Sequence, residues 1–255
     1  MTAQLRVTPD ERSLAQVGAD IVCDTVSAVP DAVLTFATGQ SGMPIYRALA
    51  ERVDRHEIDF SRVRVFELDG YVGIPLADRR SLYAWLMRDV MVPLRISERA
   101  ITRLRGEASD LLSACREYDR ALDDAGGYDL AVLGLGPNGH VAFNEPPADP
   151  ESDAHVLDVT EESVESAVRY WGSREEVPRR AIATGLKRLV AARRVLLVAR
   201  GDAKRQALER ALRSDADPLI PASFLNRSPR ATFLTDLPVR HDSASRSGGM
   251  APKAD

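Results

Sequence analysis

One continuous apolar run limits the fold more than any other feature of the sequence. From residue 130 to residue 135 every position is apolar or glycine, and the run passes directly into Gly136, Pro137, Asn138, Gly139 and His140. A strand with apolar side chains on both sides is buried on both faces, which is typical of a central strand in a parallel sheet covered by helices. The chain is therefore expected to be an α/β protein.

Other segments fit the same fold class. Apolar runs at residues 32–37, 62–68, 194–199 and 231–234 predict further strands. Helical spacing predicts helices at residues 45–53, 81–90, 107–125 and 203–212, and a first helix that Thr8 caps. Strands that alternate with helices predict a mostly parallel central sheet with helices on both faces, in a modified Rossmann-like arrangement. We expect one domain over residues 1–240 and a disordered tail over residues 241–255, where Ser, Gly and Ala are frequent.

The composition disfavours several classes of function. The 255 residues include 34 Lys+Arg and 38 Asp+Glu, so the net charge is 34 − 38 = −4, without the basic excess of a nucleic-acid-binding protein. No apolar run reaches the roughly 18–20 residues that span a bilayer, and no secretory segment opens the chain. We expect a cytoplasmic protein with no membrane partner. The helix-like apolar patterns around Cys23 and Cys115 predict buried free thiols. The spacing of the four His and two Cys predicts no metal site.

Polar residues follow several of the predicted strands. These are the turn Thr38, Gly39, Gln40 and Ser41; then Asp69; then Asn138, Gly139 and His140 with Glu145 close by; and finally Lys204. The carboxyl ends of parallel strands meet at one edge of a sheet, where ligands bind. The sequence therefore predicts an active site at that edge.

Each group has a functional and a structural interpretation. Backbone N–H groups and hydroxyls of the turn at residues 38–41 precede a helix and suit a phosphate, although a tight connection with a capping serine is the alternative. Asp69 suits acid–base chemistry, or else bonds its own backbone in a turn. His140, with Glu145 five residues later, suits a proton shuttle, the alternative being a structural histidine.

Four segments resemble a known family. DLAVLGLGPNGHVAFNEP at residues 129–146 closely resembles the hallmark loop of glucosamine-6-phosphate deaminases, which share their fold with 6-phosphogluconolactonases. ATGQSGMPIY (37–46), FELDGYVGIP (66–75) and VPRRAIATG (177–185) resemble further family segments in the same order. The resemblance spans about residues 10–237. Lactonases carry G-H-T-A-S-L-F-P, so the ending Asn144-Glu145-Pro146 favours a deaminase.

The resemblance implies a reaction and a role for each matching residue. Glucosamine 6-phosphate and water would give fructose 6-phosphate and ammonia, without a metal or organic cofactor. His140, supported by Glu145 and next to Asn138, would open the sugar ring, and Asp69 would move a proton between C2 and C1. The remaining matches would bind the phosphate (Thr38, Gly39, Gln40, Ser41, Arg169 and Lys204) or form the substrate loop (Gly70, Gly136 and Gly139).

Some positions depart from the family pattern. Gly70 replaces the usual Glu of Asp-Glu-Tyr, Gly42 replaces a usual Pro, and Asn138 stands where many members have Asp. The carboxylate missing at position 70 predicts a changed contact to the substrate's amino group or a changed pKa of Asp69. It also leaves open a related isomerase or deaminase with a shifted substrate, such as galactosamine 6-phosphate.

Two further alternatives are a lactonase, which the Asn144-Glu145-Pro146 ending argues against, and a non-catalytic sugar-phosphate sensor, which has no need of a base such as Asp69. In hexameric bacterial deaminases an Arg-x-Lys pair binds an acetylated sugar phosphate that activates the enzyme. His155 and Leu157 stand at the corresponding positions here, so activation by that route is expected to be absent. A monomer and a homo-oligomer both remain open.

Overall fold

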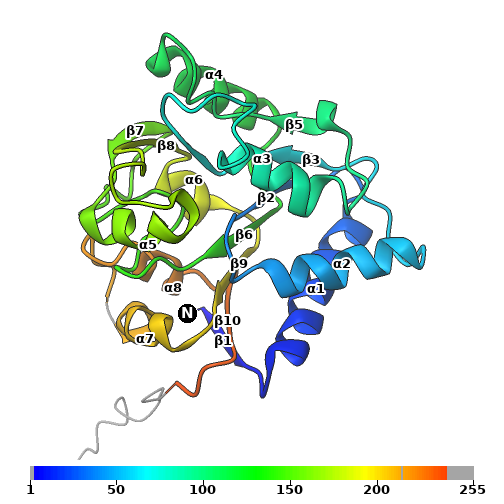
Figure 1. The fold of residues 1–255 in the computed structure, drawn as a ribbon. Coiled ribbons are helices and arrows are strands. Elements are labelled where there is room, and N and C mark those ends of the chain that lie inside the picture. The colour runs from blue at the N-terminus through cyan, green and yellow to red at the C-terminus, as the bar shows by residue number, and fades with distance from the viewer. Residues whose placement is uncertain (1–2, 214, 240–255) are drawn as a thin grey trace, which may run out of the picture.

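A parallel sheet forms the centre of the molecule (Figure 1). The computed structural model describes residues 3–213 and 215–239, so the predicted tail at residues 241–255 lies outside it. The strand order is β1 (Gln4–Val7), β10 (Ala231–Thr235), β9 (Val195–Ala199), β6 (Leu130–Gly134), β2 (Val33–Phe36), β3 (Arg64–Phe66) and β5 (Ile101–Thr102). All of its pairings are parallel, which confirms the predicted fold class.

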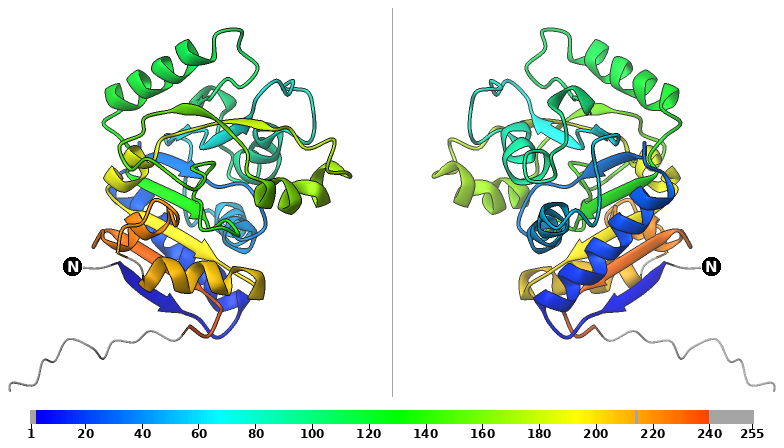
Figure 2. Two further views of the ribbon diagram at one scale, coloured as in Figure 1. Left: turned by 90° about the vertical axis from the view of Figure 1, so that its left-hand side faces the viewer. Right: turned by 90° about the vertical axis from the view of Figure 1, so that its right-hand side faces the viewer.

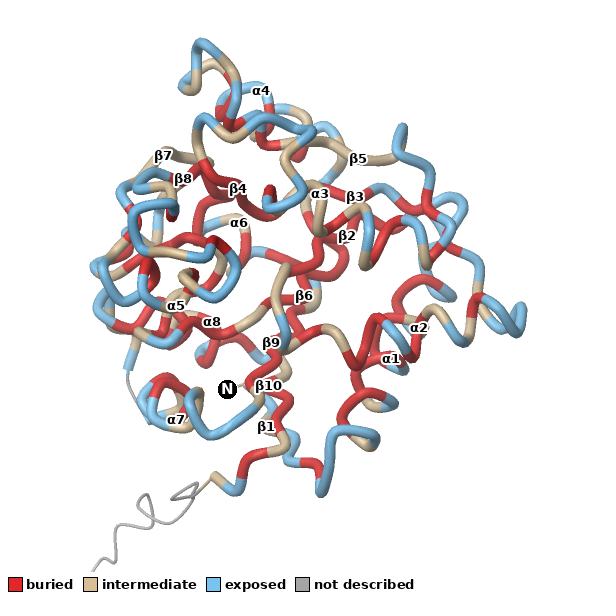
Figure 3. Tube along the Cα trace, in the orientation of Figure 1, coloured by how far each residue is buried: buried red, intermediate tan, exposed pale blue. Residues whose placement is uncertain are grey.

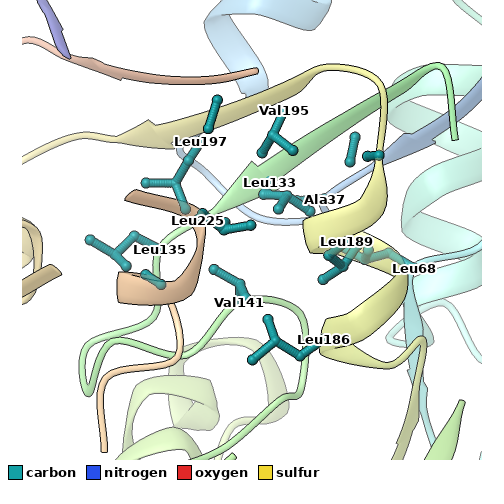
Figure 4. Packing of buried hydrophobic residues seen from close by; sticks show 14 of the residues in the cluster. Ala37, Leu68, Leu133, Leu135, Val141, Leu186, Leu189, Val195, Leu197 and Leu225 are labelled. Carbon is teal, nitrogen blue, oxygen red and sulfur yellow. The ribbon is translucent and has the colours of Figure 1, made fainter. Parts of the chain in front are cut away.

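The apolar run that limits the fold is β6, and it lies between β9 and β2. Alternate side chains of this strand point to opposite faces, as the pleat requires. Leu130 and Val132 pack into one apolar cluster, while Ala131 and Leu133 pack into another. Figure 4 shows the second cluster, in which Leu133 lies near Leu197 and Leu225. Burying each leucine contributes about 1.5–3 kcal/mol.

Helices cover both faces of the sheet (Figure 2). One face is covered by α1 (Glu11–Ala28), α2 (Met43–Asp54) and α3 (Leu82–Leu86), which continues as a π-helix over Met87–Met91. The other face is covered by α4 (Leu111–Asp124), α6 (Leu186–Ala191), α7 (Arg205–Arg213) and α8 (Ser223–Asn226). Figure 3 accordingly shows buried residues along the central strands and exposed residues on the outer sides of the helices.

A second, antiparallel sheet was not expected from the sequence. It contains β4 (Asp69–Tyr71), β8 (Arg180–Ala183) and β7 (His155–Asp158), in that order. With α5 (Glu161–Trp171) it encloses a third apolar cluster, in which Tyr71 packs edge-on against Phe143 and Trp171. The predicted strand at residues 62–68 is shorter in the structure, because β3 covers only Arg64–Phe66, and β4 begins after the predicted strand at Asp69 and joins the other sheet.

Several predicted boundaries are wrong for local reasons. Asp10, rather than Thr8, caps α1, because its carboxylate accepts the N–H of Ser13 at 2.7 Å. In the same way Asp110 caps α4, which therefore begins at Leu111 and not at residue 107.

Both cysteines are free as predicted, but only Cys115 is buried, since Cys23 is partly exposed. No helix of the described residues is long and apolar enough to cross a membrane.

Candidate active site

The order in which the chain adds strands to the central sheet reverses between β2 and β6. From β2 the chain continues through β3 to β5 on one side, and from β6 it continues through β9 to β10 on the other. Loops that leave two neighbouring strands in opposite directions open a crevice at the strand ends, where ligands of such sheets bind. A pocket of about 630 Å³ lies there. Its lining includes Thr38, Gly39, Gln40, Ser41, Asp69, Gly136, His140, Arg169 and Lys204, so the structure brings these residues to one pocket.

The turn at residues 38–41 joins β2 to α2 and leaves the start of the helix open. Ser41 does not cap α2, since the helix begins after Gly42 and no side chain within the described part of the chain caps it. A Cβ on Gly42 would lie 2.6 Å from the ring of Tyr46, whose hydroxyl donates to the Ala37 carbonyl at 2.8 Å. Glycine at position 42 therefore lets Tyr46 pack beneath the turn. The open helix N-terminus and the hydroxyls suit a phosphate.

Asp69 lies in β4 and is 8% exposed. It is paired with Ala183 of β8, so the alternative of a turn residue is wrong. Its Oδ1 has no hydrogen-bond partner in the described part of the chain, although Asp69 lines the pocket. Burial raises the pKa of Asp69 to about 7. A carboxylate with a pKa close to the working pH can accept and return a proton.

His140 is held from behind by a carboxylate. Glu145 Oε2 lies 3.2 Å from His140 Nδ1, and the same oxygen accepts hydrogen bonds from Asn138 at 2.7 Å and from Thr160 at 3.0 Å. Burial by itself would raise the pKa of Glu145, but the hydrogen bonds and the charge of His140 outweigh it and lower the pKa to about 2. Glu145 therefore stays ionised and fixes the orientation of the imidazole. Neither Glu145 nor Asn138 lines the pocket, and both contact His140.

Glycines permit this arrangement for steric reasons. A Cβ on Gly136 would lie 2.4 Å from ring atoms of His140, so only glycine lets the imidazole fold back over the loop. Gly139 has a φ of +93°, and a Cβ there would lie 2.9 Å from Ile220. Gly136 lines the pocket and Gly139 shapes the loop behind it.

Residues 9–234 match the family model of glucosamine-6-phosphate isomerases/6-phosphogluconolactonase. The chain belongs to this family. A curated glucosamine-6-phosphate deaminase of Clostridium botulinum (strain Loch Maree / Type A3) is 36% identical over 219 residues, which cover 86% of this chain and 90% of that protein. Another from Rhodopirellula baltica is 37% identical over 234 residues, covering 91% and 93%.

Solved structures agree with this membership. A monomeric glucosamine-6-phosphate deaminase has a TM-score of 0.87 and 29% identity, covering 91% of this chain and 97% of its own. The 6-phosphogluconolactonase of Thermotoga maritima has a TM-score of 0.72 and 19% identity, covering 91% and 99%, and shares the fold.

In this isomerase/lactonase family member three cations of the pocket lining, Arg79, Arg169 and Lys204, have no acidic partner within the described residues. Arg169 comes from the end of α5 and Lys204 from a 3₁₀-helix, Asp202–Lys204, after β9. Burial and the charge of Arg169 both lower the pKa of Lys204. An anion bound beside the two cations would offset that repulsion. Sequence reasoning missed four further arginines of the pocket lining, namely Arg79, Arg80, Arg88 and Arg200, the last three of which pair with acids.

Sequence reasoning also missed two residues near the imidazole, Ser163 in α5 and Thr160 at its N-cap. Ser163 Oγ lies 3.2 Å from His140 Nδ1, and Thr160, which caps α5, donates to Glu145. Both belong to an amphipathic helical pattern in which nothing marks them as functional. In the sequence, Thr160 followed by Glu161 and Glu162 resembles an ordinary helix start.

The structure gives no support to a direct contact of position 70 with the substrate's amino group, while a changed pKa of Asp69 stays a prediction. A Cβ at this position would point to Glu67 Oε1, Ile182 and the Leu104 carbonyl, each 3.9 Å away, and Gly70 is absent from the pocket lining. In a strand successive side chains face opposite sides, so with Asp69 facing the pocket position 70 faces away from it. A side chain there would therefore start on the side of β4 that faces Glu67 and Ile182. The described residues hold no cluster of three His, Cys, Asp or Glu that could bind a metal ion.

Proposed function

We propose that this chain is a glucosamine-6-phosphate deaminase, which converts glucosamine 6-phosphate and water into fructose 6-phosphate and ammonia. The observation that carries the proposal is that a buried carboxylate with a pKa of about 7, Asp69, and a carboxylate-supported imidazole, His140, line the same pocket as an open phosphate turn. Relatives at 36–37% identity with that name support it.

Phosphate binding would fix the substrate for the chemistry. The N–H groups at the start of α2 and the hydroxyls of Thr38 and Ser41 would donate hydrogen bonds to the phosphate dianion. Arg169 and Lys204 would supply positive charge beside it. Fixed cations at one group of the open-chain sugar hold the reacting carbons in place.

Ring opening falls to His140. Because Nδ1 faces Glu145, the other ring nitrogen is the one available to pass a proton to the ring oxygen. The ionised Glu145 holds the imidazole in place for this transfer.

Asp69 then removes the proton from C2 of the open-chain sugar and delivers it to C1 through an enolamine. This leaves an imine at C2, to which water adds before ammonia leaves. One carboxylate can serve both carbons because they are adjacent, and its raised pKa lets it gain and lose the proton near neutral pH.

The experiment is ammonia release from glucosamine 6-phosphate by the full chain and by Asp69→Asn. We expect kcat of the variant to fall by about 10²–10⁴-fold, with binding of fructose 6-phosphate retained. Asp59→Asn is the matched control, because Asp59 is exposed and bonds only Ser61 among the described residues. Absence of ammonia release by the wild type, or equal losses of binding and rate in Asp69→Asn, would contradict the proposal.

A shifted substrate remains the alternative, although Gly70 is absent from the pocket lining. Galactosamine 6-phosphate in the same assay tests it directly, and a sugar-phosphate lactone tests the lactonase alternative. Sugar-phosphate binding without turnover of any of these compounds would indicate a sensor. A cytoplasmic location and the absence of activation through positions 155 and 157 stay predictions.

A further inference from the structure

A second buried carboxyl group lies behind the strand that carries the proposed base. Glu67 is 3% exposed and stands two residues before Asp69, between β3 and β4. Its backbone N–H donates to the Thr102 carbonyl at 2.9 Å, and its carbonyl accepts the Tyr118 hydroxyl at 2.8 Å. Its side-chain Oε2 accepts the Leu104 N–H at 3.1 Å. Glu67 is therefore fixed by hydrogen bonds at both its backbone and its side chain.

These contacts tie Glu67 to the segment at residues 104–106, which packs on the back of β4. The Gly73 N–H donates to the Gly106 carbonyl at 2.9 Å, and a Cβ on Gly106 would lie 2.5 Å from the Tyr71 carbonyl oxygen. Glu67 Oε1 lies 3.9 Å from the place of a Cβ on Gly70. The carboxyl group of Glu67 thus borders the space that a side chain at position 70 would enter.

We propose that Glu67 is a positioning residue for Asp69: its carboxyl group holds β4 against the segment at residues 104–106 and places a second acidic group beside the base. The inference rests on the function proposed above. It gives this chain an acidic group next to Asp69 even though position 70 is glycine.

The surrounding charges disfavour ionisation of both carboxyl groups at once. Arg103 Nε lies 3.8 Å from Glu67, but the guanidinium is bound by both oxygens of Glu107 and stacks over Tyr83. Burial raises the pKa of Glu67 to about 8; the charge of Arg103 opposes this rise and the charge of Asp69 adds to it. The groups that face this pair are Arg103, Glu107, Tyr83 and Tyr118 around Glu67, and Tyr71 beside Asp69.

Two interacting carboxyl groups lose their protons in two linked steps. Near pH 7 the first proton leaves, and Asp69 can act as a base while Glu67 stays neutral. Near pH 8 the second leaves, which puts two negative charges in one buried region and removes the neutral partner. The dependence of kcat on pH should therefore change slope near pH 8 because of Glu67.

Three variants separate positioning from simple packing. Glu67→Leu removes the acceptor for the Leu104 N–H, and we expect kcat to fall about ten- to a hundredfold through misplacement of Asp69. Glu67→Gln keeps an acceptor and stays neutral at all pH values, so it should recover most of that loss and abolish the slope change near pH 8. Glu107→Gln, which removes the other carboxylate on Arg103, is the matched control and should retain the slope change.

Carbon-13 NMR of the carboxyl groups gives a readout that does not depend on turnover. The Asp69 resonance should titrate in two linked steps in the wild type and in a single step in Glu67→Gln. Identical Asp69 titration in the two proteins would overturn the proposal, even if Glu67→Leu fails to fold. Failure of the wild type to release ammonia would instead overturn the proposed function and leave the NMR result to decide the coupling of the two groups.

Discussion

Substitution of Gly70 tests which side of β4 faces the pocket. The backbone there is not in the left-handed region, and a Cβ would have only ordinary contacts at 3.9 Å. We therefore expect Gly70→Ala to raise the free energy of unfolding by about 0.4–1 kcal/mol, through the unfolded chain. Gly70→Gln must find room beside Ile182 and Leu104, and we expect it to lower the free energy of unfolding by about 1–3 kcal/mol.

Gly70→Glu adds a charge to the same volume. Two unit charges about 4 Å apart repel by about 4 kcal/mol at an effective dielectric constant near 20. Glu67 Oε1 lies 3.9 Å from the place of the new Cβ, so the added carboxylate enters the buried space that Glu67 borders. At pH 9 we expect the Glu variant to be less stable than the Gln variant by a few kcal/mol. At pH 5 both carboxyl groups can hold protons, so the difference should nearly vanish.

The assay is urea unfolding followed by the fluorescence of Trp85 and Trp171, at pH 5 and pH 9, with KM for glucosamine 6-phosphate measured alongside. Because position 70 faces away from the pocket, KM of the folded variants should change little. The reasoning is refuted if the Glu and Gln variants are equally stable at both pH values, or if Gly70→Glu changes the preference between two hexosamine phosphates while stability is unaffected.

Two further predictions concern the groups that line or support the pocket. Glu145 has a folded-state pKa lowered from 4.5 to about 2, so its stabilisation is complete above pH 4.5 and is lost as the pH falls toward 2. The stability advantage of the wild type over Glu145→Gln, on the order of 3 kcal/mol at neutral pH, should therefore shrink over that window in acid titrations of unfolding; a constant difference would argue against an ionised Glu145. Lys204→Ala should raise both KM and the inhibition constant of inorganic phosphate by about 10–100-fold with a smaller change in kcat, whereas Lys187→Ala, outside the pocket lining, should change neither.

The central sheet and the polar strand ends could be predicted because each leaves a local signal. The apolar run of β6 and the loop at residues 136–140 are contiguous in sequence, and the rule for parallel strand ends then brings His140 to the turn after β2. The small antiparallel sheet gives no such signal. Its strands are three or four residues long with mixed polarity, and they pair across more than 100 residues between β4 and β8.

That pairing decides which way position 70 faces, so the direction could not be derived from the sequence. Glu67 gave only a weak hint, as a charged residue between the apolar Phe66 and Leu68. Its burial depends on the segment at residues 104–106, which reaches it only in the folded chain.

Helix α5 and its cap contribute to both the histidine site and the phosphate-binding cations. Its cap Thr160 donates to Glu145, its Ser163 meets His140, and Arg169 near its end lines the pocket. A tilt of α5 as one body that carried Arg169 away from a bound phosphate would also withdraw the contact of Thr160 with Glu145 and that of Ser163 with His140. Phosphate binding and the orientation of the imidazole for proton transfer would therefore be gained and lost together.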